Sequence, residues 1–456
     1  MKELVNPYFL ISISIFIVSF ISSNFLNDSY SATRIIISII LSGYLFFEVI
    51  HKKGVVSLSL YKKIYILLFV YITLQAFFSP YINTSFEHSQ QLYIGTSYLL
   101  FITLFLSLNS QKYSLTSYLY FISIVSSIYI LAIAISFAFV ELKVSDTIIY
   151  YFKNIRFLNH LQTLIIPSLG LGLLVSRKEN VKTVLNILLI LNFMLLFETG
   201  GRGSLYAILF SYLFLYLTNR NSKHIQDNLI QIGILFVGSL ILYMVIYYLF
   251  SSFDRINHLL DIESSGRVLI YKTVIPYIFD WKYIITAIGF SSQDFALYGF
   301  LHPHNLFLYI FLGAGSLGLI LFILIFFNSI WKLLKEYFST KSIIKRYLFT
   351  IFLSLLIHSL VSGLYITPLT SITALYLFLV VHSYYCENEK VIIKSIYQKV
   401  NILFVTILVV SIPYLAYVNY KLKNQYSYSN DEKGTYRYVP GIMLYSIKIF
   451  NSSEEK

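Results

Sequence analysis

The chain has 456 residues, of which 57% are hydrophobic and only 12% are charged. Soluble globular domains are about a quarter charged, so this composition excludes a soluble fold and indicates a protein whose main solvent is lipid. The 34 basic and 21 acidic residues give a formal net charge of +13. In a membrane protein this charge is expected to fix topology and to attract anionic lipids or lipid diphosphates, rather than nucleic acid.

Apolar stretches long enough to cross a bilayer as an α-helix recur along the whole chain. Because none of them alternates with a period of two, they predict helices rather than barrel strands. We therefore expect an all-α fold, a polytopic membrane bundle of about 12–13 transmembrane helices with one long outer loop that contains short helices. In chain order the predicted spans are 8–25, 35–50, 64–79, 93–108, 117–141, 161–176, 183–197, 204–218, 229–250, 303–328, 347–364, 366–385 and 400–418.

Lysines and arginines in the loops predict how these helices are oriented, because cytoplasmic loops are enriched in basic residues. If the N-terminus is cytoplasmic and the spans alternate, more than half of the 34 basic residues lie on the cytoplasmic side. The loops at about 142–160, 198–203 and 251–302 then fall on the outer side. We expect one transmembrane domain over residues 1–418 and a polar outer tail over residues 419–456.

The segment Leu301–Asn305 directly precedes an apolar helix and contains the residues His-Pro-His-Asn. Proline is favoured at the first position of a helix, so Pro303 is expected to open it, with His304 and Asn305 in its first turn. The free N–H groups and the positive dipole end of that turn attract anions such as phosphate. The same dipole disfavours imidazolium, so His304 would stay neutral and could accept a proton. Alternatively, both residues only cap a helix at the membrane interface.

Small residues follow along the same predicted helix, at Gly313, Ala314, Gly315 and Gly318. Ala314 and Gly318 are four residues apart and share one face. In membranes such spacing lets a neighbouring helix approach closely, so we expect these residues to serve helix packing.

A second basic feature lies in the long outer loop, where Ser264 precedes an apolar periodic run and predicts a helix start. Val268, Tyr271 and Ile275 share a face, so this helix is expected to lie along the membrane surface. Arg267 would project near its N-terminus, where a guanidinium can bind phosphate oxygens in bidentate geometry. The alternative is a solvated charge on an interfacial helix.

The connection Thr199–Gly203 holds Arg202 among three glycines, which permit a sharp bend. It is too short to carry the guanidinium far into water. A charge held at the ends of two membrane helices is costly, so it should be paired. The partner would be either Glu198, which makes the arginine structural, or a diphosphate ligand.

Arg156, which precedes Asn159 and His160 at the start of a predicted span, is a weaker candidate of the same kind. Polar groups inside predicted spans are more often packing residues than ligands, and we expect this of His358. The chain has no CxxC or HExxH motif, no glycine-rich nucleotide loop and no acidic cluster, so neither a metal nor a cofactor is expected.

Together, these features resemble the signature of the superfamily of O-antigen ligases, O-antigen and capsule polymerases, and related protein O-oligosaccharyltransferases. The resemblance covers about residues 150–328, and the three features share the order and the outer location of that signature. In chain order they are the Thr199–Gly203 turn with Arg202, the Ser265–Arg267 helix start with Tyr271, and His304-Asn305 followed by Gly315 and Gly318.

The resemblance implies a metal-independent, inverting glycosyltransferase of the bacterial inner membrane, with residues 251–302 as its periplasmic catalytic loop. The donor would be an undecaprenyl-diphosphate-linked glycan. The acceptor would be lipid A-core in a ligase, which the His-Asn-Gly spacing slightly favours, or the growing glycan in a polymerase. His304 and Arg267 would be catalytic, while Arg202, Asn305 and Arg156 would bind substrate. The remaining implied partners are membrane lipid and polysaccharide-assembly proteins.

Two departures from the signature leave the acceptor open: Tyr271 stands where some ligases have leucine, and residues 306–314 contain no acidic residue. A polysaccharide-lipid flippase or other transporter is the alternative from a different class. Transporters place polar groups near the membrane midplane, often in repeated halves. A transferase would instead bring Arg202, Arg267 and His304 together in one outward-facing place.

Overall fold

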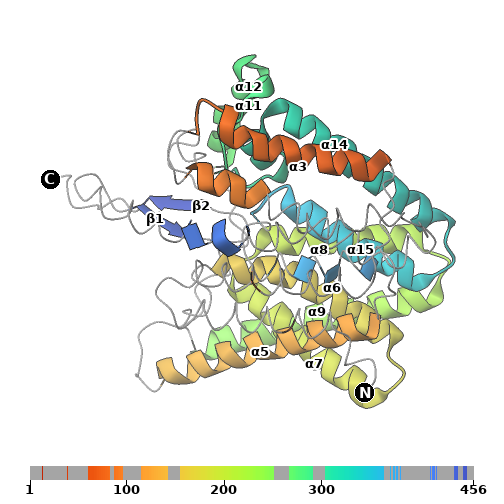
Figure 1. Cartoon of the computed structure of the whole chain (residues 1–456). Coiled ribbons are helices and arrows are strands. Elements are labelled where there is room, and N and C mark those ends of the chain that lie inside the picture. The colour runs from red at the N-terminus through yellow and green to blue at the C-terminus, as the bar shows by residue number, and fades with distance from the viewer. Residues whose placement is uncertain are drawn as a thin grey trace.

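The computed structural model describes residues 60–82, 87–95, 115–141, 155–250, 267–290 and 303–363, two short strands, and isolated helical positions elsewhere (Figure 1). Long helices run side by side in this part of the chain and form a bundle. The elements are α3 (Leu60–Phe78), α5 (Leu115–Glu141), α6 (Ile155–Val175), α7 (Glu179–Glu198), α8 (Arg202–Thr218), α9 (Lys223–Phe250), α11 (Arg267–Phe279), α12 (Lys282–Ile285), α14 (Leu306–Ser339), α15 (Ile343–Ser359), β1 (Tyr436–Val439) and β2 (Tyr445–Lys448).

The predicted all-α membrane bundle is confirmed. Predicted spans correspond to α3, α5 to α9, α14 and α15, and within the described ranges five helices are long and apolar enough to cross a membrane: α5, α6, α7, α9 and α14. The predictions at 8–25, 35–50, 366–385, 400–418 and most of 93–108 lie largely outside the described residues. The tail adds an antiparallel hairpin that was not predicted, in which Tyr436 pairs with Lys448.

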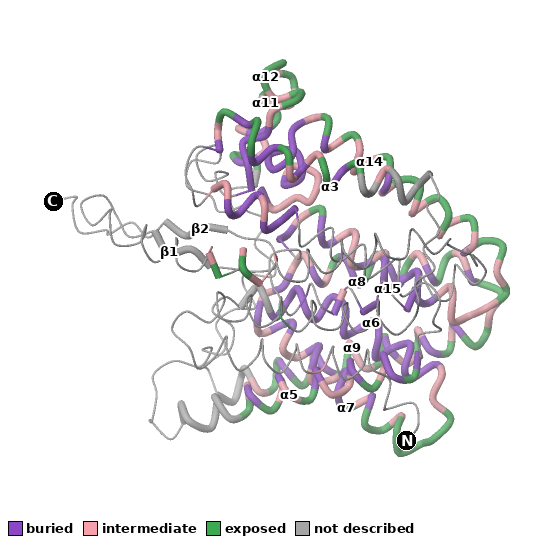
Figure 2. The backbone as a smooth tube through the Cα atoms, in the orientation of Figure 1, coloured by how far each residue is buried: buried purple, intermediate pink, exposed green. Residues whose placement is uncertain are grey.

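Helix α6 forms the centre of the bundle, packed against α5, α7, α8, α9 and α15. Of its apolar span 94% is buried, against 17% for α9, which faces outward over most of its length (Figure 2). Gly170 explains how closely the neighbours approach, because a Cβ there would lie 2.5 Å from the Tyr347 hydroxyl and 2.7 Å from the Tyr212 hydroxyl. Only glycine lets α8 and α15 meet α6 at this point.

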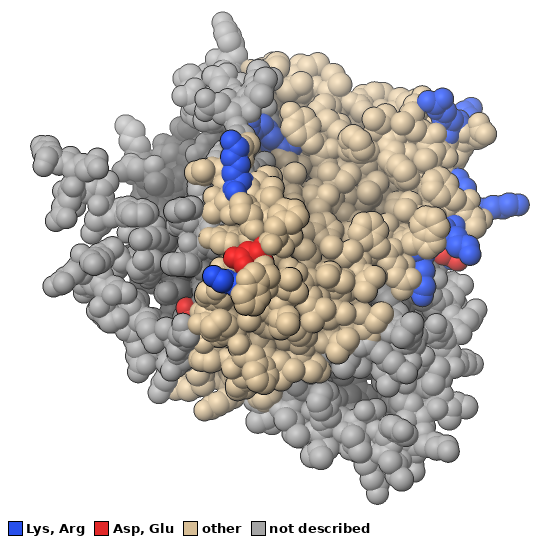
Figure 3. Space-filling model, turned by 90° about the horizontal axis from the view of Figure 1, so that it is seen from above, with Lys and Arg blue, Asp and Glu red and all other residues tan. Residues whose placement is uncertain are grey.

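One end of the bundle, here called the Arg346 end, carries the turns 176–178, 219–222 and 340–342. Basic side chains gather toward this end, on the right of Figure 3. Buried Asn219 joins two of the turns, since its amide nitrogen donates to the Tyr337 hydroxyl (2.8 Å) and its oxygen accepts from Arg346. These three described turns, which the alternation of the predicted spans places on the cytoplasmic side, therefore lie at the same end of the bundle.

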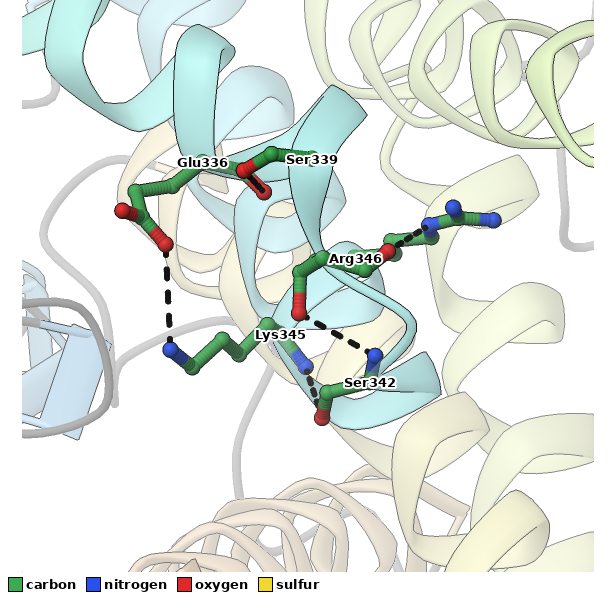
Figure 4. A network of polar contacts seen from close by, with 6 residues as sticks. Glu336, Ser339, Ser342, Lys345 and Arg346 are labelled. Carbon is green, nitrogen blue, oxygen red and sulfur yellow. Dashed lines mark hydrogen bonds and ion pairs between the residues drawn. The ribbon is translucent and has the colours of Figure 1, made fainter.

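The turn between α14 and α15 shows how this end is closed (Figure 4). Ser342 is the N-cap of α15, and its hydroxyl accepts from the backbone N–H of Lys345 at 3.4 Å. The Lys345 ammonium lies 3.8 Å from the Glu336 carboxylate of α14. An N-cap serine is worth about 1 kcal/mol to a helix, whereas this partly exposed ion pair with a long N–O distance of 3.8 Å adds little.

Candidate functional site

The end of the bundle opposite the Arg346 end contains the turn that connects α7 to α8, and is called the Arg202 end. Gly200 has a φ of 63°, which glycine adopts without strain. Gly201 lies against α6, because a Cβ on it would be 2.6 Å from the side chain of Asn159. Thr199 donates a hydrogen bond to that same side chain. Gly200 and Gly201 therefore let the turn bend and press onto α6, and Arg202 becomes the first residue of α8.

The Arg202 side chain is half-buried, and among the described residues it forms no ion pair or side-chain hydrogen bond. Glu198, the partner considered from the sequence, instead accepts a hydrogen bond from the Tyr243 hydroxyl at 3.0 Å. The described residues thus contain no Glu198–Arg202 pair. A half-buried guanidinium in this position remains able to bind an anion.

The start of α14 corrects one prediction. The helix begins at Leu306, not at Pro303, and Asn305 is its N-cap. The Asn305 side-chain oxygen accepts from the backbone N–H groups of Phe307 (2.9 Å) and Leu308 (3.2 Å). Asparagine is among the best N-cap residues, and its cap overrides the preference of proline for the first helical position. The N–H groups expected to attract an anion are therefore partly occupied by the protein itself.

His304 precedes this cap in an unusual backbone conformation. Its φ is 51°, and it is the only non-glycine residue with a positive φ in the described part of the chain. A left-handed conformation costs a residue with a Cβ about 1–2 kcal/mol and prevents helix continuation. The half-buried imidazole is thus placed just outside the first turn of α14. Asn305 anchors this segment, because its amide nitrogen donates to the carbonyl of Leu360 at 2.9 Å.

Farther along α14, Gly315 interrupts the helix with φ 68° and ψ 179°, a conformation essentially restricted to glycine. A Cβ at this position would lie 2.9 Å from the carbonyl oxygen of Thr286 and 3.1 Å from that of Tyr283. Gly315 therefore serves a kink and a close approach of the loop after α12, not the helix packing expected of it. Gly318 does face a neighbouring helix, since a Cβ there would lie 3.4 Å from Tyr71 of α3.

Two buried glutamines hold the loop after α12 against the kink, and the sequence analysis did not identify them. Gln75 of α3 donates to the carbonyl of Ile285 (2.9 Å) and accepts from the N–H of Ala287 (3.0 Å). Gln91 donates to the carbonyl of Gly313 (3.1 Å), two residues before the kink, and accepts from the N–H of Phe290 (3.2 Å). Glutamine inside or beside an apolar span was the available signal.

Helix α11 begins at Arg267 and packs onto the first turns of α14. Ile270 and Val274 are buried in a cluster with Phe311 and Leu312 of α14. The backbone of Arg267 is thereby fixed one turn from this contact, while its side chain, like that of Arg156 at the start of α6, lies outside the described residues. The prediction that both arginines bind phosphate remains a prediction.

The outer face of α11 and α12 is apolar and exposed, at the edge of the bundle (Figure 1). Phe279 is 83% exposed, Trp281 76% and Ile285 65%. Apolar and aromatic side chains of this kind suit the membrane interface. Near the tip, burial raises the pKa of the Tyr283 phenol above its ordinary value of 10, so this side chain stays neutral even in mildly alkaline solution.

We expect this face to contact lipid, which tryptophan fluorescence can measure because the chain has only two tryptophans. In a Trp331→Phe variant reconstituted into vesicles, the remaining Trp281 should be quenched by brominated acyl chains and protected from aqueous iodide. The reciprocal variant Trp281→Phe is the comparison, because its fluorescence comes only from Trp331, which lies near the Arg346 end. Quenching of Trp281 by iodide but not by brominated lipid would contradict a lipid-facing α11–α12 segment.

A buried polar cluster lies beneath the Arg202 turn. His358 of α15 contacts the hydroxyls of Thr163 (2.6 Å) and Ser204 (3.5 Å) through Nδ1. Its ring makes an edge contact with His160, at a centroid distance of 5.2 Å, and His160 Nε2 is bonded to the Ser362 hydroxyl at 2.7 Å. From the sequence, His358 was expected only to pack, because the partners of its side chain are distant in the chain and no local pattern reveals them.

The end of α15 lies between the start of α8 and the start of α14. A Cβ on Gly203 would be 3.0 Å from His358 and 3.6 Å from Val361. On the other side, Leu360 is bonded to Asn305. Arg202 directly precedes Gly203, and His304 directly precedes Asn305. The two residues therefore flank the same end of α15. Within the described ranges, no group of three His, Cys, Asp or Glu side chains gathers as a metal site would.

Comparison with known proteins relates part of the chain to a protein family. The family model described as O-antigen ligase matches residues 187–323, from within α7 to within α14. The matched region includes Arg202, Arg267, His304 and Gly315, whereas His160 and His358 lie outside it. None of the curated proteins compared with the chain matches it. The family match confirms the resemblance drawn from the three sequence features.

Proposed function

We propose that this multi-pass membrane protein, whose residues 187–323 match the O-antigen ligase family model, transfers an undecaprenyl-diphosphate-linked glycan to an acceptor hydroxyl. The reaction would take place on the periplasmic side of the bacterial inner membrane, at the Arg202 end. One observation carries this proposal: the start of α8 with Arg202 and the start of α14 with His304 flank the end of α15.

The donor diphosphate would bind at the start of α8. Gly201 has no side chain that could cap this helix, whereas the start of α14 is capped by Asn305. Arg202 is the first residue of α8, so its guanidinium would act together with the positive dipole end of this helix. Arg267 would complete the site from α11, and Arg156 would contribute from the start of α6. These groups supply positive charge where the leaving diphosphate develops negative charge.

His304 would act on the acceptor. In the proposed step, the acceptor hydroxyl oxygen bonds to the anomeric carbon of the donor sugar while the bond from that carbon to the diphosphate oxygen breaks. The bonding electron pair leaves with undecaprenyl diphosphate, the hydroxyl proton passes to the neutral imidazole, and attack opposite the leaving group inverts the anomeric carbon. A positioned base of this kind contributes about 10²–10⁴-fold. The amide of Asn305 has one N–H left to orient a substrate.

Lipid A-core is the favoured acceptor, and a growing glycan, which would make the protein a polymerase, is the alternative. The spacing of His304, Asn305, Gly315 and Gly318 supports the ligase. A transporter receives less support, because the polar groups named above gather at one end of the helices and not at midspan.

Arg267→Lys tests the proposal. Lysine keeps the charge but loses the bidentate geometry, and the loss of one charge-assisted hydrogen bond predicts a fall in glycan transfer of about 10–100-fold. Transfer would be measured in vesicles with a radiolabelled lipid-linked glycan and, in a deletion strain, by electrophoresis of surface glycans. Loss of all capped lipopolysaccharide indicates a ligase, whereas retention of a single repeat unit indicates a polymerase.

Lys272→Arg provides the matched control, since Lys272 is an exposed residue on the same helix. It should transfer glycan at the wild-type rate. Full activity of Arg267→Lys would show that Arg267 does not bind the donor diphosphate. Normal surface glycan in the deletion strain would reject the proposed function as a whole.

A further inference from the structure

We infer that His358 is a positioning residue, which holds the start of α8 so that Arg202 faces the donor. The identity of the ligand rests on the proposed function, whereas the contact between His358 and α8 does not. His358 lies outside the region matched by the family model, and nothing in the motifs assigns it a role.

The hydrogen-bond pattern around His358 determines which of its nitrogens carries the hydrogen. The Thr163 hydroxyl donates to the carbonyl of Asn159 at 3.1 Å, and the Ser204 hydroxyl donates to the same carbonyl at 2.6 Å. Each hydroxyl has a single hydrogen, so both oxygens present lone pairs to His358 Nδ1. With both hydroxyls donating to Asn159, we assign the hydrogen to Nδ1, which then donates to Thr163 at 2.6 Å.

This arrangement turns the opposite edge of the imidazole toward α8. A Cβ on Gly203 would be 3.0 Å from His358 Nε2 and 3.1 Å from Cδ2, so the ring lies directly against the backbone next to Arg202. Ser204, one residue further, contacts Nδ1. The ring is thus held on α6 by its N–H and supports the first turn of α8 with its other edge.

His160 keeps the ring in this orientation from the side. It packs edge-on against His358 and is bonded to Ser362, two residues beyond the Leu360 carbonyl that accepts from Asn305. One buried unit therefore connects α6, the start of α8 and the end of α15. Displacement of His358 would move Arg202 relative to the start of α14 without touching the substrate.

The test compares His358→Leu, which removes the donor, with His358→Asn, whose amide can still donate near the Nδ1 position. In vesicles, His358→Leu should raise KM for the lipid-linked glycan about tenfold with kcat within about threefold, because a buried hydrogen bond is lost while the reacting groups remain. His358→Asn should restore most of the affinity. Thr163→Val removes only the oxygen that accepts from His358 and should raise KM in the same way. This variant provides the test if His358→Leu folds poorly.

Hydrogen–deuterium exchange of the apo protein supplies a readout that does not depend on the function. Residues 196–206 should exchange faster in His358→Leu and Thr163→Val than in wild type, whereas His224→Leu, an exposed histidine on α9, should leave them unchanged. Unchanged exchange in both variants, or a fall in kcat that His358→Asn does not restore, would overturn the inference. If exchange is faster in the two variants but the wild-type protein does not bind undecaprenyl diphosphate, the proposed function is rejected and the positioning role stands.

Discussion

His304→Gly is expected to lower glycan transfer by about 10²–10⁴-fold, the usual contribution of a positioned base, while the bundle remains folded. Glycine suits this position because His304 has a φ of 51°, which glycine adopts without strain. Transfer would be measured with a lipid-linked glycan in vesicles. Added imidazole should restore part of the activity, since the variant removes the side chain and leaves the backbone in place.

His304→Ala is the matched control for stability. At an ordinary position a glycine variant is less stable than an alanine variant by about 0.5–1 kcal/mol. Here alanine keeps the left-handed strain of about 1–2 kcal/mol that glycine relieves, so the glycine variant should be at least as stable as the alanine variant. Thermal unfolding in detergent compares them. Transfer above a tenth of the wild-type rate in both variants would exclude His304 as the base.

Gly315→Ala should abolish transfer by displacing the loop after α12. The alanine would have to adopt φ 68° and ψ 179°, which costs about 1–3 kcal/mol. Its Cβ would also meet the carbonyl oxygens of Thr286 and Tyr283 at 2.9 and 3.1 Å, both of which belong to backbone and cannot rotate away. The loop directly follows α12 and α11 in the chain. Its displacement should therefore move both helices, and Arg267 at the start of α11, away from their positions against α14. Transfer and thermal unfolding measure both effects.

Gly233→Ala is the control for this change, because a Cβ on Gly233 of α9 would have no neighbour within 4 Å. This variant should be slightly more stable than wild type, by about 0.5–1 kcal/mol, since alanine is the better helix former. It should transfer glycan normally. A Gly315→Ala protein with wild-type activity and stability would show that the kink is dispensable.

The sequence alone predicted the helical bundle and the order of its polar features. Lipid permits spanning segments only as structures that satisfy their own backbone hydrogen bonds, so apolar length suffices to predict helices. The loop charges also predicted which loops lie together. The start of α14 was misplaced because the sequence supports two helix starts, Pro303 as first residue and Asn305 as cap. The contact of Asn305 with Leu360 favours the second, and no local pattern contains it.

Only the tertiary structure determined which polar side chains lie in contact with one another. His358 and Thr163 are separated by 195 residues, and Gln75 and Ile285 by 210, so their hydrogen bonds depend on how α6, α15, α3 and the loop after α12 pack. The same packing gave different roles to Gly315, which kinks α14, and to Gly318, which faces α3. Helix formation is a local consequence of apolar sequence in lipid, whereas the partner of a buried polar atom depends on which helix surfaces fit together.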